Sequence, residues 1–266
     1  MKIIELITWF EGWANPSLQE NWDNSGWQIE PGCLSEEARV LVCLTPTIAV
    51  IQEAIALRES GIPINLIFAH HPLIFGQLKS LQIGNAIADI AKLAFSHQIG
   101  IYTAHTNFDQ VNHGTADVLA QVLGLKLVKP MLPTQDGVGY GRVGVIEPAQ
   151  TLDELLSRIK LQLSVPALLV SLNADTNQII NKLAVLGGSG AGYIKEAVAA
   201  GANAYLTADC KFHQFQEARD RNLILIDAGH YATERPACAR LVEKFRILGV
   251  EWVELSQQDE DFRQYF

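Results

Sequence analysis

The sequence is poor in cysteine, in positive charge and in long apolar runs, and each shortage argues against a class of protein. Its four cysteines are far apart and form no C-x-x-C pair, which argues against a zinc knuckle and a compact disulfide framework. The formal net charge is −9 without a basic cluster, so a nucleic-acid partner is disfavoured. No apolar run reaches the roughly 18–20 residues of a membrane span. We therefore expect a cytoplasmic protein with no membrane partner.

The composition that remains is that of a globular protein. The chain has 266 residues, of which 48% are hydrophobic and 18% are charged. This length is sufficient for a well-buried core and for two subdomains. The first residues, "MKIIELITWFEGW", place Glu5 and Glu11 inside an apolar stretch. We interpret them as an amphipathic helix and not as a signal peptide.

Strand-like and helix-like segments alternate along most of the chain. In the first half, the predicted strands are 40–44, 66–69 and 100–103, and the predicted helices are 47–58, 85–97 and 115–122. In the second half, the predicted strands are 142–146, 167–170, 182–186, 204–207, 223–227 and 250–255, and the predicted helices are 152–161, 193–200, 211–221 and 233–248. This order predicts an α/β fold with largely parallel sheets covered by helices.

A stretch rich in proline and glycine separates the two halves. Residues 126–140 show no periodicity, so we predict a linker there and a domain boundary near Lys126. The first lobe would then comprise residues 1–126 and the second would comprise 127–235. Both lobes are predicted to have similar α/β/α layers.

Histidine and carboxylate side chains gather where predicted strands end, which is where open parallel sheets collect functional groups. The segments "FAHHPLIF", "YTAHTNFD" and "DAGHYATE" each follow an apolar run, and "TADCKFHQFQEA" follows another. The residues of interest are His70, His71, His105, Asp109, Asp209, Lys211, His213, Asp227, His230 and Glu234.

Two adjacent imidazoles, His70 and His71, have three interpretations. They could belong to an ordinary turn before Pro72, or bind one metal ion where the chain bends, since neighbouring strand residues face opposite ways. Alternatively, each could bind a different ion of a close pair, as in two-metal hydrolases. The i, i+4 spacing of His230 and Glu234 suits one face of a helix, but it also suits a simple helix start.

Five of these residues form a set of three imidazoles and two carboxylates without sulfur. Such a set suits Zn, Mn, Fe, Co or Ni and could hold two ions. The set is His70, His71, Asp109, His230 and Glu234. Separately, the loop "GGSGAGY" with Gly188, Ser189 and Gly190 fits no nucleotide-binding motif. It is either a tight strand-to-helix turn or a loop whose N–H groups bind a substrate anion.

Together with the early segment "PSLQENWDNSGWQI", the four strand-end segments resemble the signature segments of the Nif-three-like dinuclear-metal-centre family, also described as GTP cyclohydrolase I type 2 homologues. The resemblance extends from about residue 8 to residue 255, and the segments keep their order. It implies a two-lobed α/β/α protein in which the C-terminal part, 236–266, completes the first lobe. It also implies a toroidal homohexamer, a trimer of dimers, with dinuclear sites facing the cavity.

The resemblance assigns two divalent ions to the same five ligands and places His105 beside them. It implies a metal-dependent hydrolase, with ring opening of a nucleotide such as GTP as the expected reaction. His105, and more weakly His213, could move protons. The alternative is a non-catalytic hexameric metal-binding or regulatory scaffold. Nucleic-acid binding in the ring cavity is a third reading, which the net charge disfavours.

Overall fold

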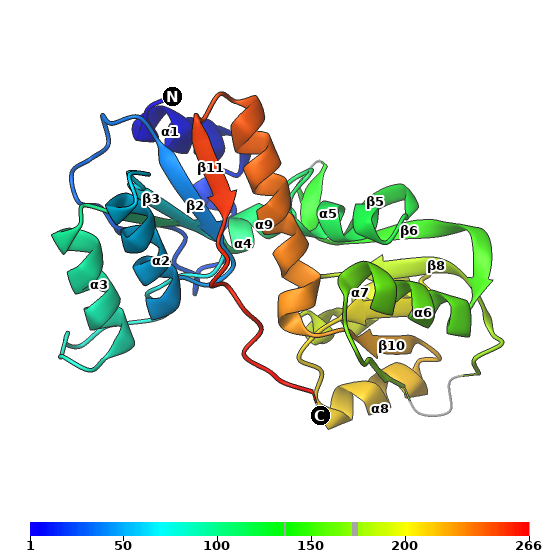
Figure 1. Ribbon diagram of the computed structural model, residues 1–266. Coiled ribbons are helices and arrows are strands. Elements are labelled where there is room, and N and C mark those ends of the chain that lie inside the picture. The colour runs from blue at the N-terminus through cyan, green and yellow to red at the C-terminus, as the bar shows by residue number, and fades with distance from the viewer. Residues whose placement is uncertain (136, 172–174, 266) are drawn as a thin grey trace. The chain divides into compact units, whose positions relative to one another are not determined.

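The computed structural model describes residues 1–135, 137–171 and 175–265, which form two compact units (Figure 1). Unit 1 consists of Met1–Phe108 and Cys238–Glu260, and unit 2 consists of Asp109–Ala237 and the residues from Asp261 onward. The boundary predicted at Lys126 therefore falls inside unit 2. Two of the crossings between units lie within helices, α4 (Thr106–Gln110) and α9 (His230–Ile247). None of the helices in these ranges is long and apolar enough to cross a membrane.

Unit 1 contains a five-stranded sheet in the order β1-β4-β3-β2-β11. Its strands are β1 (Gly26–Ile29), β2 (Arg39–Cys43), β3 (Leu66–Ala69), β4 (Gly100–Thr103) and β11 (Trp252–Leu255). All neighbours are parallel except β1, which is antiparallel to β4. The sheet is thus largely parallel, as predicted, and the edge strand β1 is an addition that the sequence pattern did not indicate.

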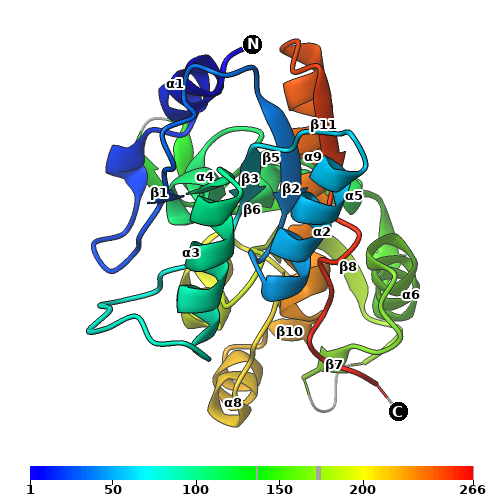
Figure 2. The ribbon, with the colours of Figure 1, turned by 60° about the vertical axis from the view of Figure 1, so that its left-hand side comes forward.

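Helices cover both faces of this sheet, because β3 is apolar on both sides. Ile67 and Ala69 belong to the cluster that includes buried side chains of α2 (Ile48–Glu59) and α3 (Ala86–Ser96). Phe68 points the other way, with ring centroids 4.8 Å from Phe10 and 5.1 Å from Phe245. These two partners lie in α1 (Ile3–Trp13) and in the part of α9 that belongs to unit 1. Figure 2 shows α2 and α3 together in front of the strands.

Unit 2 contains a six-stranded sheet in the order β5-β6-β8-β9-β10-β7. Its strands are β5 (Lys126–Gln135), β6 (Val138–Thr151), β7 (Leu169–Val170), β8 (Ile179–Val185), β9 (Ala204–Thr207) and β10 (Ile224–Asp227). The three strands β8, β9 and β10 are parallel, whereas β5, β6 and β7 are joined by antiparallel pairing. This sheet is mixed, and the expectation of a largely parallel sheet holds for unit 1 only.

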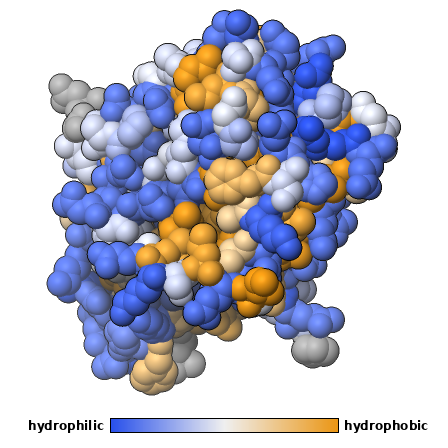
Figure 3. Space-filling model, turned by 90° about the vertical axis from the view of Figure 1, so that its left-hand side faces the viewer, coloured by the Kyte–Doolittle hydropathy of each residue, from blue (hydrophilic) through white to orange (hydrophobic). Residues whose placement is uncertain are grey.

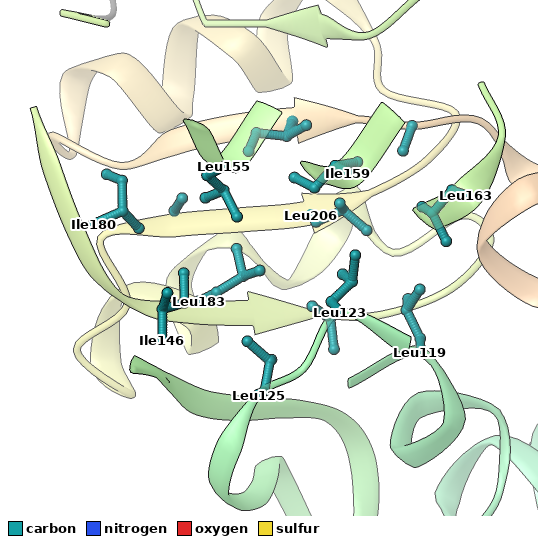
Figure 4. Packing of buried hydrophobic residues seen from close by; sticks show 14 of the residues in the cluster. Leu119, Leu123, Leu125, Ile146, Leu155, Ile159, Leu163, Ile180, Leu183 and Leu206 are labelled. Carbon is teal, nitrogen blue, oxygen red and sulfur yellow. The ribbon is translucent and has the colours of Figure 1, made fainter. Parts of the chain in front are cut away.

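In unit 2, the side chains of the parallel strands also alternate between the two faces of the sheet, and both faces are packed. Leu183, Leu206 and Ile226 pack with buried leucines and isoleucines from α5 (Thr115–Val122) and α6 (Leu152–Leu163) (Figure 4). The opposite face packs against α7 (Ile194–Ala199) and α8 (Phe212–Asp220). The short 3-10 helix Ala191–Tyr193 directly precedes α7. Each unit is therefore an α/β/α layer structure.

The linker predicted at 126–140 is instead a β-hairpin formed by β5 and the start of β6. Pro130 and Pro133 argued against a strand, yet β5 is an edge strand, where a missing N–H is tolerated. Gly139 has a φ of +152°, and a Cβ there would lie 2.2 Å from the carbonyl oxygen of Leu132. The prolines and glycines thus fit a tight hairpin, and the linker prediction was wrong.

Several large apolar side chains of unit 1 remain exposed. They are Ile4, Trp22, Phe75, Leu78, Leu81, Ile83, Phe95 and Ile247. Figure 3 shows hydrophobic residues gathered near the centre of one face, surrounded by hydrophilic ones. Exposed apolar surface of this kind commonly marks a place where another molecule binds.

Candidate metal-binding site

His70 and His71 directly follow β3, and backbone hydrogen bonds fix both residues. The N–H of His70 donates to the carbonyl of Cys43 at 3.2 Å, and the N–H of His71 donates to that of Leu44 at 2.8 Å. The strand itself ends at Ala69, and these two bonds hold the histidines beside the end of β2. His70 is buried, whereas His71 is half-buried, so the two side chains emerge in different surroundings.

Three imidazoles of unit 1 come together at this strand end. The ring centroid of His70 lies 5.2 Å from that of His71 and 5.2 Å from that of His105, and His71 and His105 are 5.7 Å apart. One ring nitrogen from each lies within 4.8 Å of the others. Neutral imidazole nitrogens are common ligands of first-row transition metals, so this group could hold a metal ion.

Each of these rings is anchored at its Nδ1 atom by a different protein group. Nδ1 of His70 lies 2.7 Å from the carbonyl oxygen of Ala104, and Nδ1 of His105 lies 2.7 Å from a carboxylate oxygen of Asp23. These oxygens only accept hydrogen bonds, so both Nδ1 atoms carry the hydrogen, and in the neutral ring Nε2 keeps its lone pair. Nδ1 of His71 lies 2.8 Å from the hydroxyl of Thr45, which can donate or accept. In each ring Nε2 is the nitrogen that is not bonded to the anchor, so it is the candidate ligand atom, oriented as supporting groups orient metal-bound histidines.

Asp23 is the most strongly held of these anchors. Its side chain is 0% exposed, and it also accepts hydrogen bonds from the N–H of Thr106 at 3.0 Å and from the hydroxyls of Thr106 and Ser25. Burial alone would raise the pKa of this carboxyl, but the hydrogen bonds and charge of His105 and the hydrogen bonds of Thr106 hold it well below its usual range. Asp23 is thus an ionised, fixed partner for His105.

Replacing Asp23 by asparagine is expected to redistribute the His105 tautomers, because the neutral amide no longer selects the form with hydrogen on Nδ1. Imidazole ¹⁵N chemical shifts of the metal-free protein measure this, with His105→Gln to assign the signals. Thr106→Val is the matched control: it removes another hydrogen bond to Asp23 and leaves the contact with His105. An unchanged His105 spectrum in Asp23→Asn contradicts the assigned role.

Unit 2 contains a second group of donors, at the ends of β9 and β10. His230 and Glu234 lie one turn apart in α9, and Nε2 of His230 is 2.9 Å from a carboxylate oxygen of Glu234. Nδ1 of His230 is 2.6 Å from a carboxylate oxygen of Asp209. Burial lowers the pKa of His230, but the hydrogen bonds and charges of Glu234 and Asp209 raise it to about 9. An imidazole held between two carboxylates marks a place that favours a cation.

The start of α9 differs from the prediction, which placed it at Thr233. The helix begins at His230 because Gly229, with a φ of +86°, turns the chain directly after β10. The N–H of Gly229 donates to Asp227 at 2.9 Å, which fixes that turn. The i, i+4 relation inferred from spacing is thereby confirmed for His230 and Glu234.

The glycine loop that follows β8 packs against Glu234. A Cβ on Gly188 would lie 2.0 Å from a carboxylate oxygen of Glu234, and its φ of +63° also suits glycine. The N–H groups of Gly188 and Gly190 donate to the hydroxyls of Thr233 and Thr207, both at 3.0 Å. Those two N–H groups therefore have protein acceptors already, and the close turn leaves room for the carboxylate.

Two further predicted site residues, Asp109 and His213, lie on helices within unit 2. Asp109 belongs to α4 within unit 2, where its carboxylate accepts a hydrogen bond from the hydroxyl of Thr115 at 2.5 Å. His213 is exposed on α8 and lines an open surface hollow with Glu217 and Arg221. Within the described parts of the chain, His213 is not a member of a closely spaced donor group.

Sequence reasoning assigned no role to Asp23, Thr45 or the carbonyl of Ala104. Asp23 lies 82 residues from its partner His105, and Thr45 lies 26 residues from His71. Spacing within a segment cannot reveal such partners. The quoted "NWDNSGW" segment contains Asp23, and this was the available signal.

Comparisons with known proteins found relatives along nearly the whole chain. The family model of Duf34/NIF3 (NGG1p interacting factor 3) matches residues 1–260. A relative from Nostoc sp., named GTP cyclohydrolase 1 type 2 homolog, is 68% identical over 266 residues, covering 100% of this chain and 99% of the relative. A Helicobacter pylori protein named GTP cyclohydrolase 1 type 2 is 33% identical, and the match covers 82% of this chain and 81% of that protein.

Solved structures share the fold over the whole chain. The Staphylococcus aureus protein SA1388 matches with a TM-score of 0.86 and 28% identity, covering 100% of this chain and 99% of that one. A Bacillus cereus protein related to NIF3 matches with a TM-score of 0.89 and the same coverage, at 23% identity. The matches in sequence and in structure place the chain in the Duf34/NIF3 family.

Proposed function

We propose that the protein is a metal-dependent hydrolase with a dinuclear centre whose ligands are His70, His71, Asp109, His230 and Glu234. The observation that carries the proposal is the group of three imidazoles in unit 1, each anchored at Nδ1. The pair of His230 and Glu234 supports it, because a cation would suit that carboxylate-rich position. The assignment of both donor groups to one centre comes from the family resemblance.

The donor chemistry fits divalent first-row ions, since it consists of imidazole nitrogens and carboxylate oxygens. When bound, two such ions lower the pKa of water and polarise a carbonyl or C=N group of the substrate. The protein's own contribution is orientation: Ala104, Thr45 and Asp23 direct the imidazoles, and the glycine loop packs against Glu234. In this proposal His105 is not a metal ligand, so its Nε2 is available to accept a proton while Asp23 holds its Nδ1.

The names of the relatives support a proposal for the substrate, and the family resemblance supports one for the assembly. Relatives named GTP cyclohydrolase 1 type 2 homolog make ring-opening hydrolysis of GTP the first reaction to test. We also propose a homohexamer, a trimer of dimers, with a mass of about six times 29.3 kDa. Sedimentation equilibrium measures that mass directly.

Metal analysis followed by a turnover screen tests the proposed function. Protein purified without an affinity tag is expected to contain two metal ions per chain, and fewer than one after gentle handling contradicts the dinuclear centre. Metal-reconstituted protein is expected to open the ring of GTP or a related nucleotide. Asp109→Asn and Glu234→Gln are expected to lose this turnover. The matched controls Asp220→Asn and Glu217→Gln change an exposed and a half-buried carboxylate on α8 and should retain it.

The alternative function is a non-catalytic metal-binding scaffold. The description of the family supports this alternative, because that description names an interacting factor. Full metal occupancy without turnover of any nucleotide in the screen supports the scaffold. Turnover that both ligand variants abolish supports the enzyme.

A further inference from the structure

Two exposed aromatic rings of unit 1 stand beside the imidazole group. Trp22 is 57% exposed and Phe75 is 65% exposed, whereas Phe10, Phe68 and Tyr102 of the same unit are buried. The ring centroids of Trp22 and Phe75 are 5.8 Å apart and their planes are tilted by 55°. Two large aromatic side chains that stay exposed to water do not gain the free energy of burial. Packing of the core therefore does not explain why this pair is present.

Both rings border His105, which itself borders His70 and His71. The centroid of Trp22 lies 5.9 Å from that of His105, and the centroid of Phe75 lies 6.4 Å from it. A molecule resting on the two rings would therefore lie next to the imidazole group. This location separates the pair from the other exposed apolar side chains of unit 1.

The residues next to the pair are held by hydrogen bonds. Next to Trp22, the carboxylate of Asp23 accepts hydrogen bonds from His105, Thr106 and Ser25. Next to Phe75, both the N–H and the carbonyl of Ile74 are bonded. Neighbours held in this way restrict where the two rings can lie, which lowers the entropic cost of binding a ligand.

Side chains from β1 and the turn before it hold Ile74. The amide of Asn24 donates to the carbonyl of Ile74 at 2.8 Å, and the N–H of Ile74 donates to the amide oxygen of Gln28 at 3.0 Å. The amide of Gln28 also donates to the carbonyl of Asn24 at 2.7 Å. The loop with Phe75 is thus tied to the segment with Trp22.

We infer that Trp22 and Phe75 form a stacking site for a planar aromatic heterocycle, such as a purine base, whose reacting part faces the imidazole group. The inference deepens the proposed function and rests on it for the identity of the heterocycle. Stacking suits this pair because every base has a π-face, and no charged group of the ligand is required for it.

Guanosine binding to the full-length protein, measured by isothermal titration calorimetry, tests the site. Trp22→Ala and Phe75→Ala are each expected to weaken binding by about 5- to 150-fold, the range for loss of one stacking ring. Trp22→Phe and Phe75→Tyr keep a ring and should bind nearly as well as the wild type. Phe95→Ala is the matched control, because Phe95 is 55% exposed on α3 and should not affect binding.

Three results overturn the inference. The first is no guanosine binding to the wild type, and the second is an affinity in both alanine variants that equals that of the wild type. The third is a change of sedimenting mass in these variants without a change of affinity. The last result would identify the rings as a contact with a second copy of the chain. Binding does not require turnover. If the protein is inactive but binds guanosine through both rings, the result contradicts the proposed hydrolase and supports the stacking site. Conversely, if the protein is active and its KM is unchanged in Trp22→Ala, the result supports the proposed hydrolase and contradicts the stacking site.

Discussion

Replacing Arg142 by methionine is expected to lower the free energy of unfolding by about 3–5 kcal/mol, the usual cost of removing one partner of a buried ion pair. The side chain of Arg142 is 1% exposed in β6. Its guanidinium bonds Asp117 at 2.5 and 3.1 Å. It also donates to the backbone carbonyls of Gly139, Gly141, Gln110 and Val111. The variant leaves these acceptors without their donor and a carboxylate without its counter-charge.

Urea denaturation of the full-length protein measures this loss, with the m-value checked for constancy. Arg221→Met is the matched control: Arg221 pairs with Glu217, both side chains are 38% exposed, and the expected change is about 0.3–0.5 kcal/mol. Adding Asp117→Asn to Arg142→Met is expected to recover part of the stability, because it removes the uncompensated charge. A loss below about 1 kcal/mol in Arg142→Met would falsify the structural role given to this residue.

Replacing His70 or His71 by glutamine is expected to reduce the metal content from two ions per chain to about one, with a different ion lost in each variant. The reason is geometric and rests on the proposed dinuclear centre. The two ring centroids are 5.2 Å apart, and each Nδ1 is held by its own anchor, so the Nε2 atoms are set separately. Ions of a two-metal site lie roughly 3.5–4 Å apart, which suits one imidazole for each ion.

Elemental analysis gives the number of ions, and anomalous diffraction from crystals of each variant shows which position is empty. His97→Gln serves as the control, since His97 lies at the end of α3, away from β3 and its donors, and should leave both ions bound. If both variants empty the same position, the two histidines serve a single ion. If His70→Gln and His71→Gln both retain two ions, neither residue is a required ligand.

Much of the fold could be predicted, because apolar runs and helix signals are local. The strands 66–69, 100–103 and 204–207 and the helix 115–122 match the observed bounds residue for residue. The hairpin of β5 and β6 could not be predicted, because its prolines are tolerated only at a sheet edge, and edge position is a property of the whole sheet. The helix α4 has only five residues and shows no clear period, and β1 contains Gly26 and Gln28 where the predicted strands have an apolar run.

The candidate site, like the fold, could be predicted only in part from the sequence. The relation of His230 to Glu234 follows from helical spacing, so the sequence revealed it. The anchors of the imidazoles come from segments that are distant in the chain, so folding alone brings them together. The role of Gly188 was also hidden, since it depends on how closely the loop approaches Glu234.

The anchored imidazoles have a consequence for how the protein would acquire metal. The hydrogen bonds to Ala104, Thr45 and Asp23 join protein groups and need no ion, and β3 is held in its sheet independently of them. Small zinc domains fold only when the metal arrives, whereas this donor group is built by the fold itself. For the proposed centre, folding and metal loading would then be separate events, and an ion could leave and be replaced without unfolding. The supply of metal in the cell, following the usual order of affinities, would decide which ion the protein carries.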